Sequence, residues 1–212
     1  MQTIGVITGD IISSTAIPLK HKSDLICTIK ETAKAIGKLT DIKIEFFRGD
    51  SFQVLVYDAT QSAYIAILLR SSIQLHTPDS ASQKWDARIA IGIGSVSYDS
   101  GELITSDGEA FHNSGWEFDQ LGKRNLAIRT PWPDVNDELF VSTAFADDII
   151  TNWSITQAKA VYYALLINTT QREIATKLNT THQNVSKILS AAKEQLVRNY
   201  LTRFNILVQE KY

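Results

Sequence analysis

Two aspartates stand at positions where a carboxylate could bind a metal ion. Asp10 follows an apolar, β-branched run in T-G-D-I-I-S-S-T, and Asp50 lies in F-F-R-G-D-S-F-Q, which is typical of a hairpin. Paired carboxylates near backbone carbonyls suit a Mg²⁺ ion that also carries the phosphates of a nucleotide. An aspartate beside a glycine is equally common in ordinary turns, because it hydrogen-bonds its own backbone. The spacing alone leaves both interpretations open.

A second group of polar residues lies near the C-terminus, in the segment 170–189. Its sequence, T-Q-R-E-I-A-T-K-L-N-T-T-H-Q-N-V-S-K-I-L, is typical of two short helices joined by a sharp turn at Asn179, which can adopt the left-handed conformation. S/T-x-x-E/Q capping boxes predict helix starts at Ser154 with Gln157, at Thr170 with Glu173, and at Thr180 with Gln183. The pattern predicts a helix-turn-helix.

The second of these helices is expected to expose residue types that read the grooves of DNA. They are Thr181, His182, Gln183, Asn184, Ser186 and Lys187. An amide such as Asn184 can bond adenine through two hydrogen bonds, and Lys187 can reach guanine or a phosphate. A plain helical bundle with a solvated face, or a contact with another protein, would use the same types. DNA binding is the interpretation that the motif favours.

The elements that must position Asp10 and Asp50 alternate between strand and helix patterns. We predict strands at 2–9, 41–47, 52–57, 86–96, 125–129 and 139–143, and helices at 20–39, 59–76 and 108–122. This βαββαβ order predicts an α+β fold of the ferredoxin-like class, with an antiparallel sheet backed by helices. In that topology the first strand and the hairpin are neighbours. From 144 onward the chain is predicted to be helical, which divides it into domains at 1–150 and 151–212.

Charge is distributed unevenly between these two parts. Residues 151–212 hold eight basic against three acidic residues, a net charge of +5, whereas residues 1–150 hold 13 against 20, a net charge of −7. A basic C-terminal part agrees modestly with DNA binding. Neither a signal peptide nor a membrane-length apolar run is recognised, so a cytoplasmic protein is expected. A single cysteine excludes an intramolecular disulfide.

Several motifs, in order, resemble the strand and loop signatures of class III nucleotidyl cyclases. They are G-D-I-I-S-S-T, F-F-R-G-D-S-F-Q-V, A-R-I-A-I-G-I-G-S-V, S-D-G-E-A-F-H-N-S-G and L-F-V-S-T-A-F, which span most of residues 1–150. The resemblance implies that Asp10 and Asp50 hold metal ions, Mg²⁺ or Mn²⁺. It also implies that a nucleotide contacts Ile11, Ser13, Ser14, Thr15 and Gly49. A cyclase-like domain followed by a helix-turn-helix resembles the SatD family of bacterial proteins.

The chain departs from the cyclase pattern where that family completes its reaction. His112 and Trp116 stand where cyclases have an Asn and an Arg, and Phe46 stands where they have a base-selecting Lys or Glu. Loss of one preorganised charge stabiliser typically costs a hundredfold or more in rate. We therefore assign no catalytic residue and expect little or no cyclase activity.

These observations favour a bacterial transcription regulator. It would bind DNA through the helix-turn-helix, sense a nucleotide with Mg²⁺ or Mn²⁺ through a degenerate cyclase-like domain, and act as a homodimer on a palindromic site. The alternative is a metal-dependent nucleotide enzyme, either a diverged nucleotidyl cyclase or a related phosphoryl-transfer enzyme, whose helical tail is regulatory. A scaffold that uses both parts only for protein contacts is the third hypothesis.

Overall fold

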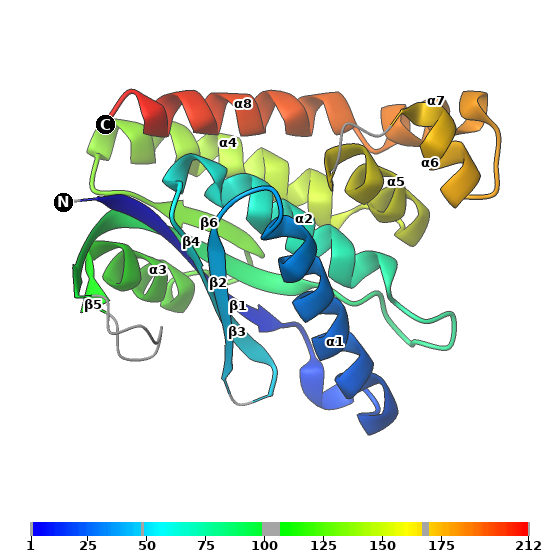
Figure 1. The fold of residues 1–212 in the computed structure, drawn as a ribbon, viewed down its shortest axis with the longest axis horizontal. Helices are drawn as coiled ribbons and strands as arrows, with labels where there is room; N and C mark the ends of the chain where they lie inside the picture. Colours follow the sequence, from blue (N-terminus) through cyan, green and yellow to red (C-terminus); the bar gives the residue numbers. More distant parts are fainter. Residues whose placement is uncertain (1, 48, 99–106, 167–169, 212) are drawn as a thin grey trace.

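The computed structural model describes residues 2–47, 49–98, 107–166 and 170–211, which form a mixed α/β fold with a curled, mainly antiparallel sheet (Figure 1). The strands are β1 (Thr3–Ile11), β2 (Ile42–Phe47), β3 (Ser51–Val56), β4 (Ala87–Tyr98), β5 (Asp107–Gly108) and β6 (Leu126–Arg129). They are ordered β2-β3-β1-β4, with β5 antiparallel to β4, and β6 pairs with β4 in parallel. The predicted adjacency of the first strand and the hairpin is therefore present.

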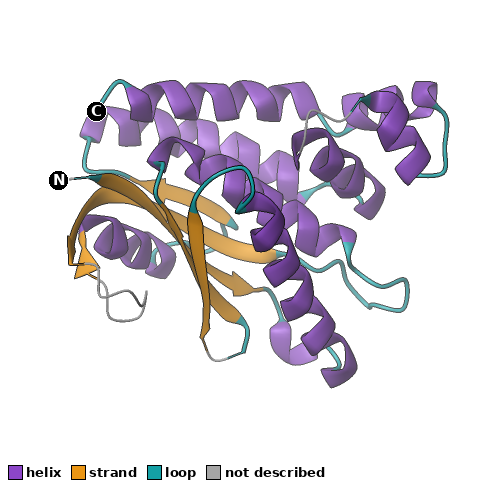
Figure 2. Cartoon of the chain, in the orientation of Figure 1, coloured by secondary structure: helices purple, strands orange, loops and turns teal. Residues whose placement is uncertain are grey.

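Helices cover both faces of this sheet (Figure 2). They are α1 (Leu19–Ile36), α2 (Ser62–Leu75), α3 (Glu109–Asp119), α4 (Pro133–Thr151), α5 (Ile155–Leu166), α6 (Gln171–Lys177), α7 (His182–Ala191) and α8 (Glu194–Gln209). The helix α3 lies on one face, and α1, α2 and α4 lie on the other (Figure 1).

Successive side chains of β1 point to opposite faces of the sheet, which explains why helices pack on both faces. Ile7 and Ile11 are buried in the large hydrophobic cluster that includes α1 and α2, whereas Ile4 and Val6 are buried against α3. At Gly92 of β4 an added Cβ would lie 2.2 Å from the carbonyl oxygen of Ala110. This glycine therefore lets α3 lie directly on the sheet.

The predicted strand at 139–143 is wrong, because this segment lies inside α4. Pro133 occupies the first turn, where a proline favours a helix start, and the helix continues to Thr151. The residues that α4 buries follow helical spacing: Val135, Leu139, Thr143, Ala146 and Ile150. A strand would instead bury alternate residues, yet Phe140 and Val141 are adjacent and both exposed. The apolar and β-branched residues of L-F-V-S-T are typical of a strand, which is why the helical spacing of this segment was not recognised.

The C-terminal helices confirm two of the three predicted capping boxes. Ser154 with Gln157 and Thr170 with Glu173 each form both reciprocal hydrogen bonds. The third box is wrong by one residue, since Thr181 caps α7 by accepting the N–H of Asn184. The reason is local: the N–H of Thr180 bonds the Ala175 carbonyl at the end of α6, so Thr180 still belongs to the turn.

The final helix, α8, buries its apolar stripe within the chain itself. The stripe residues Val197, Tyr200, Phe204, Leu207 and Val208 are all buried. The Tyr200 hydroxyl hydrogen-bonds Thr143 of α4 at 3.0 Å, and Arg203 pairs with Glu138 of α4. The stripe therefore packs on α4 in the monomer. Across the part of the chain that the structure describes, no helix combines the length and apolar character needed to cross a membrane.

Candidate functional site

The two predicted metal ligands lie at the same end of the sheet. Asp10 is paired in register with Ser51 across β1 and β3, and the N–H of Ile11 donates to the main-chain carbonyl of Asp50 at 3.1 Å. Residues 40 positions apart in the sequence are thus held side by side by sheet pairing. Their position follows from the βαββ order that the sequence predicts.

The side chains of these two aspartates have different partners. The Ser14 hydroxyl donates to Oδ2 of Asp50 at 2.5 Å. The carboxylate of Asp10 instead forms an ion pair with Arg88 on β4 at 2.9 Å, and the Arg88 guanidinium lies 5.6 Å from the centre of the Phe118 ring. A cation binding at Asp10 must therefore compete with an arginine that neutralises it.

A pocket of about 300 Å³ brings most of the predicted nucleotide-binding residues together. Its lining comprises Ile11, Ser14, Thr15 and Gly49 from the prediction, the predicted metal ligand Asp50, and also Ile17, Lys22, Leu25 and Ile26. Ser13 does not line it, but it turns the chain into the pocket wall with a left-handed backbone (φ 53°). Ile11 comes from β1, and Lys22, Leu25 and Ile26 come from α1, while the other lining residues lie in the two turns and the connection that leads into α1.

The donor set of this pocket suits Mg²⁺ or Mn²⁺ only in combination with a ligand. Asp50 and the Ser14 hydroxyl supply hard oxygen atoms, which these ions prefer. Among the described residues no group of three or more His, Cys, Asp or Glu side chains could hold a metal ion. Magnesium is commonly bound by one or two carboxylates plus the phosphates of a substrate, so the chemistry fits a metal that arrives with a nucleotide.

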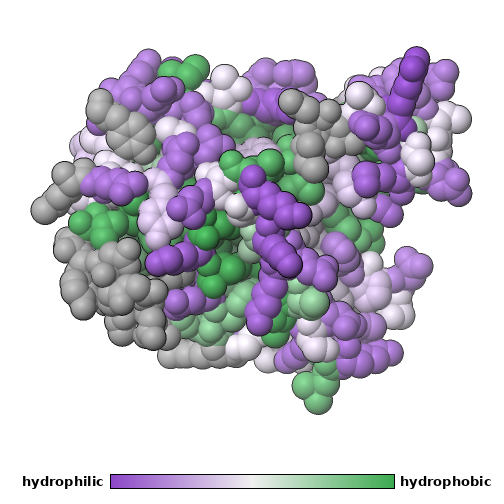
Figure 3. Space-filling model, in the orientation of Figure 1, coloured by the Kyte–Doolittle hydropathy of each residue, from purple (hydrophilic) through white to green (hydrophobic). Residues whose placement is uncertain are grey.

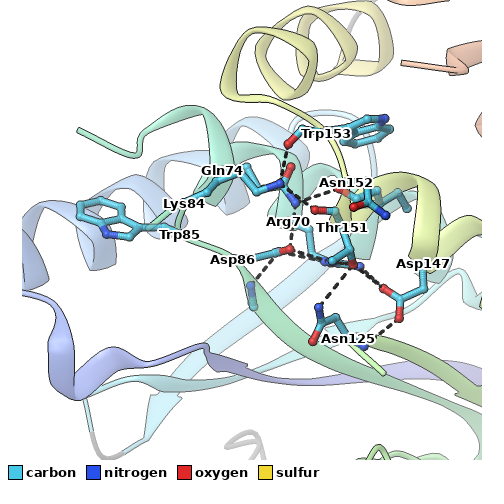
Figure 4. Close-up of polar contacts among 12 residues, drawn as sticks. Arg70, Gln74, Lys84, Trp85, Asp86, Asn125, Asp147, Thr151, Asn152 and Trp153 are labelled. Carbon is cyan, nitrogen blue, oxygen red and sulfur yellow. Dashed lines mark hydrogen bonds and ion pairs between the residues drawn. The ribbon is translucent and has the colours of Figure 1, made fainter. Parts of the chain in front are cut away.

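A buried network of charged residues supports the loop that forms this pocket (Figure 4). Arg70 of α2 is completely buried and pairs with Asp86 and Asp147, each at 2.6 Å. Burial disfavours the charged guanidinium, but the two carboxylates more than offset this and raise the pKa of Arg70. The main-chain carbonyl of Asp86 accepts the N–H of Ile12 at 3.0 Å, which fixes the start of the loop.

The same network continues to the C-terminal helices. Lys84 donates to the carbonyls of Thr151 and Trp153, at the junction between α4 and α5, and burial lowers its pKa. The indole N–H of Trp153 donates at 2.8 Å to the carbonyl of Ala192, the residue that ends α7. The pocket loop and the predicted recognition helix are therefore both anchored to residues around Arg70.

The residues predicted to contact DNA are all exposed at the N-cap and in the first turns of α7. They are Thr181, His182, Gln183, Asn184, Ser186 and Lys187, whereas Val185 and Leu189 of the same helix are buried. Asn179 has the left-handed backbone that the turn requires (φ 49°). Hydrophilic residues cover most of the visible surface over α6 and α7 (Figure 3). The Asn184 amide donates to Thr180 within the chain at 2.9 Å.

His112 and Trp116 lie on the exposed side of α3. The imidazole of His112 lies 2.9 Å from the carboxylate of Asp107, and the guanidinium of Arg129 lies 3.9 Å from the ring centre of Trp116. An arginine from β6 is thus present beside the position where the cyclase pattern has its own arginine. Local sequence patterns do not predict this contact, because the two residues lie on different elements.

Sequence reasoning also missed Lys22, Arg88 and the Arg70 network. One signal was available for Arg70, since it is the single charged residue of the apolar segment 62–75. A lone charge within an otherwise apolar helix indicates a buried partner. Arg88 and Lys22 stand among other charged residues and carry no such signal.

The chain matches no known protein-family profile, and no curated protein is similar to it. Among solved structures it is similar to the GGEEF domain of a diguanylate cyclase from Vibrio cholerae, with 14% identity and a TM-score of 0.43, covering 60% of this chain and 83% of that one. It is also similar to the guanylyl cyclase domain of the RhoGC fusion protein from Blastocladiella emersonii, with 17% identity and a TM-score of 0.43. This match covers 54% of this chain and 72% of that one. A third similar structure is a bacterial light-regulated adenylyl cyclase, with 12% identity and a TM-score of 0.40. This match covers 59% of this chain and 74% of that one. These similarities are too distant to assign an activity to this chain.

Proposed function

We propose that the pocket at the ends of β1 and β3 binds a nucleoside polyphosphate together with Mg²⁺ or Mn²⁺. One observation carries this proposal: the turn after β1 and the hairpin turn before β3 contribute Ile11, Ser14, Thr15, Gly49 and Asp50 to one pocket. The motif resemblance selects the same residues, and Ser13 contributes through the backbone that it turns. The pocket lining and the motif resemblance therefore support the same site.

The residues of the pocket have complementary roles toward such a ligand. Lys22 supplies a positive charge for phosphate oxygens, and the hydroxyls of Ser14 and Thr15 can donate hydrogen bonds to them. Asp50 would hold the metal ion, which neutralises phosphate charge when bound. Asp10 does not line this pocket and pairs with Arg88 beside Phe118 of α3, so Asp10 would serve as a metal ligand only after exchanging Arg88 for the ion. The strand order supports a ferredoxin-like, cyclase-like domain over residues 1–150.

Equilibrium binding of ATP and GTP, measured by calorimetry with Mg²⁺, Mn²⁺ or EDTA, tests this proposal. We expect nucleotide binding to require the metal. It should weaken at least about tenfold in Asp50→Ala, because this substitution removes the charged carboxylate that would bind the metal. Asp137→Ala, which removes an exposed aspartate on α4, is the matched control and should bind normally. Metal-independent binding, or normal binding by Asp50→Ala, would show that the pocket has another ligand.

The same samples distinguish a nucleotide sensor from an enzyme. Replacement of the Asn and Arg positions by His112 and Trp116 favours binding without cyclisation. Incubation with ATP or GTP and either metal, followed by chromatography, would reveal cyclic or hydrolysed products. Turnover that Asp10→Ala abolishes would establish the diverged cyclase or phosphoryl-transfer alternative in place of the sensor.

We further propose that residues 151–212 form a helix-turn-helix domain that binds DNA through α7, as in the SatD-like architecture. The specific observation is that all six predicted contact residues, five on α7 and Thr181 at its N-cap, are exposed, while Val185 and Leu189 hold the helix against the core. The N-terminus of α7 also favours a phosphate. A homodimer would present two such helices to a palindromic site, which makes a cytoplasmic regulator the expected role.

The role of α7 in DNA binding is tested by measuring, at several salt concentrations, the affinity for the DNA upstream of the gene that encodes this chain. Lys187→Ala should weaken binding to all sequences and reduce the salt slope by about one, whereas Asn184→Ala should lower the preference for the selected sequence. Lys38→Ala, an exposed lysine in the connection between α1 and β2, is the control. Equal DNA binding by Lys187→Ala, Asn184→Ala and the unmodified chain would exclude α7 as the reading element.

A further inference from the structure

A second pocket adjoins the first around the N-terminus of α1. It has a volume of about 260 Å³ and lies between the start of α1 and the connection from α2 to β4. Its lining consists of Ala16, Ile17, Pro18, Lys20, His21, Ser80, Ala81, Ser82, Gln83 and Trp85. Ile17 lines both pockets, so the two lie next to each other.

The second pocket combines flat rings with polar groups. The imidazole of His21 and the indole of Trp85 lie 5.9 Å apart between ring centres, with their planes tilted by 60°. Trp85 is 5% exposed, while the His21 side chain is 22% exposed, so His21 offers the accessible ring face. Ser80, Ser82 and Gln83 add hydroxyl and amide groups on the facing side. Such a lining suits a planar heterocycle with polar edges.

One ligand that spans both pockets would have the volume that small-molecule sites usually provide. Small-molecule sites usually occupy about 300–1,000 Å³, and each pocket alone is at or below the lower end of that range. A polyphosphate and a base, joined by a sugar, need both spaces. The first pocket holds the charged residues Lys22 and Asp50, and the second holds the aromatic rings.

The basic residues in the first turn of α1 favour the binding of an anionic group at the boundary between the two pockets. Lys20, His21 and Lys22 follow one another there, and the turn contains no acidic residue. Cations are unfavourable at a helix N-terminus because the helix dipole is positive there. The Asp24 carboxylate, 3.9 Å from the His21 ring, compensates only part of this charge. A bound phosphate would compensate the rest.

We propose that the pocket formed by His21, Trp85 and residues 80–83 binds the base of a purine nucleotide whose phosphates occupy the Asp50 pocket. This inference rests on the proposed nucleotide function. His21 stacks on the base, and the polar groups of Ser80, Ser82 and Gln83 hydrogen-bond its edge.

Comparison of ATP with inorganic tripolyphosphate, both with Mg²⁺, tests the base pocket by calorimetry. We expect ATP to bind at least about tenfold more tightly, which is the range for one stacked base. His21→Ala should remove most of this preference and leave tripolyphosphate binding within about twofold. His21→Phe should retain the preference, since it keeps an aromatic ring for stacking. Lys22→Ala should weaken both ligands equally.

Matched controls make the outcomes distinguishable. His76→Ala changes a histidine at the end of α2, outside both pockets, and should bind both ligands normally. Equal affinity of the unmodified chain for ATP and tripolyphosphate would overturn the base pocket and leave the phosphate site intact. An ATP preference that survives in His21→Ala would also overturn it. Absence of binding by both ligands would overturn the proposed function, and the base pocket with it.

Discussion

Arg70 lies at the centre of a buried network of charged and polar side chains. Its guanidinium donates to Asp86, Asp147 and Thr151, and Gln74 adds a further hydrogen bond to Asp86 at 2.9 Å (Figure 4). A buried ion pair is a weak source of net stability, because desolvation costs about as much as the attraction returns. Removal of one partner is costly, however, since the other charge stays buried without compensation.

We therefore expect Arg70→Met to destabilise the protein by about 3–5 kcal/mol, because it leaves two buried carboxylates without their cation. Urea denaturation followed by circular dichroism measures this free energy. Arg203→Met is the control: both side chains of the Arg203–Glu138 pair are exposed to solvent, and such pairs contribute little to stability. An Arg70→Met variant as stable as Arg203→Met would show that the network is dispensable.

The control pair also has a defined pH dependence. The hydrogen bond from Arg203 lowers the pKa of Glu138 below its ordinary value of 4.5. Its small contribution is therefore complete above that value and is lost as the pH falls through the lowered pKa. The stability difference between the unmodified chain and Arg203→Met should shrink in this acidic range.

Sequence patterns located residues whose role depends on nearby positions, and they missed residues whose role depends on distant ones. Asp10, Asp50 and the turn residues lie in short motifs, so their types and spacing are readable. Arg88 becomes significant only because β4 pairs with β1 and brings it beside Asp10. The partner of a charged side chain on another element is set by tertiary packing, which local periodicity does not record.

At the scale of elements, local chemistry predicted starts and turns better than it predicted the type of a short apolar segment. The order β1-α1-β2-β3-α2-β4 and the left-handed Asn179 agree with the sequence patterns. The segment 139–143 did not, because five residues are too few to separate a helical period from an alternating one. The signal was Pro133, which favours the first turn of a helix.

The start of α7 provides a test at this scale. Thr181 accepts the N–H of Asn184, so Thr181→Ala should destabilise the protein by about 1 kcal/mol through the lost cap. Thr180→Ala should cost less, because Thr180 contributes only an exposed bond from the Asn184 side chain. Chemical denaturation of both variants measures the difference. A larger loss in Thr180→Ala would place the cap where the sequence pattern predicts it.

The molecule as a whole is held together by one hydrophobic cluster that crosses from the sheet into the C-terminal helices. It includes Ile7 of β1, Ile67 of α2, Val161 of α5, Val185 of α7 and Phe204 of α8. The difference in net charge between residues 1–150 and 151–212 suggested two domains. Net charge does not show which residues of the two parts are buried together. Their shared interior arises because α5 packs along α2 and α8 packs along α4.

The short connection between α4 and α5 has a mechanical consequence. Only residues 152–154 separate these helices, and Trp153 is itself buried, with its indole bonded to the end of α7. The helices α6 and α7 therefore do not hang on a flexible linker. A change in the angle of α7 would break the contact of Trp153 with Ala192 and disturb the packing of α7 on α5 and α8.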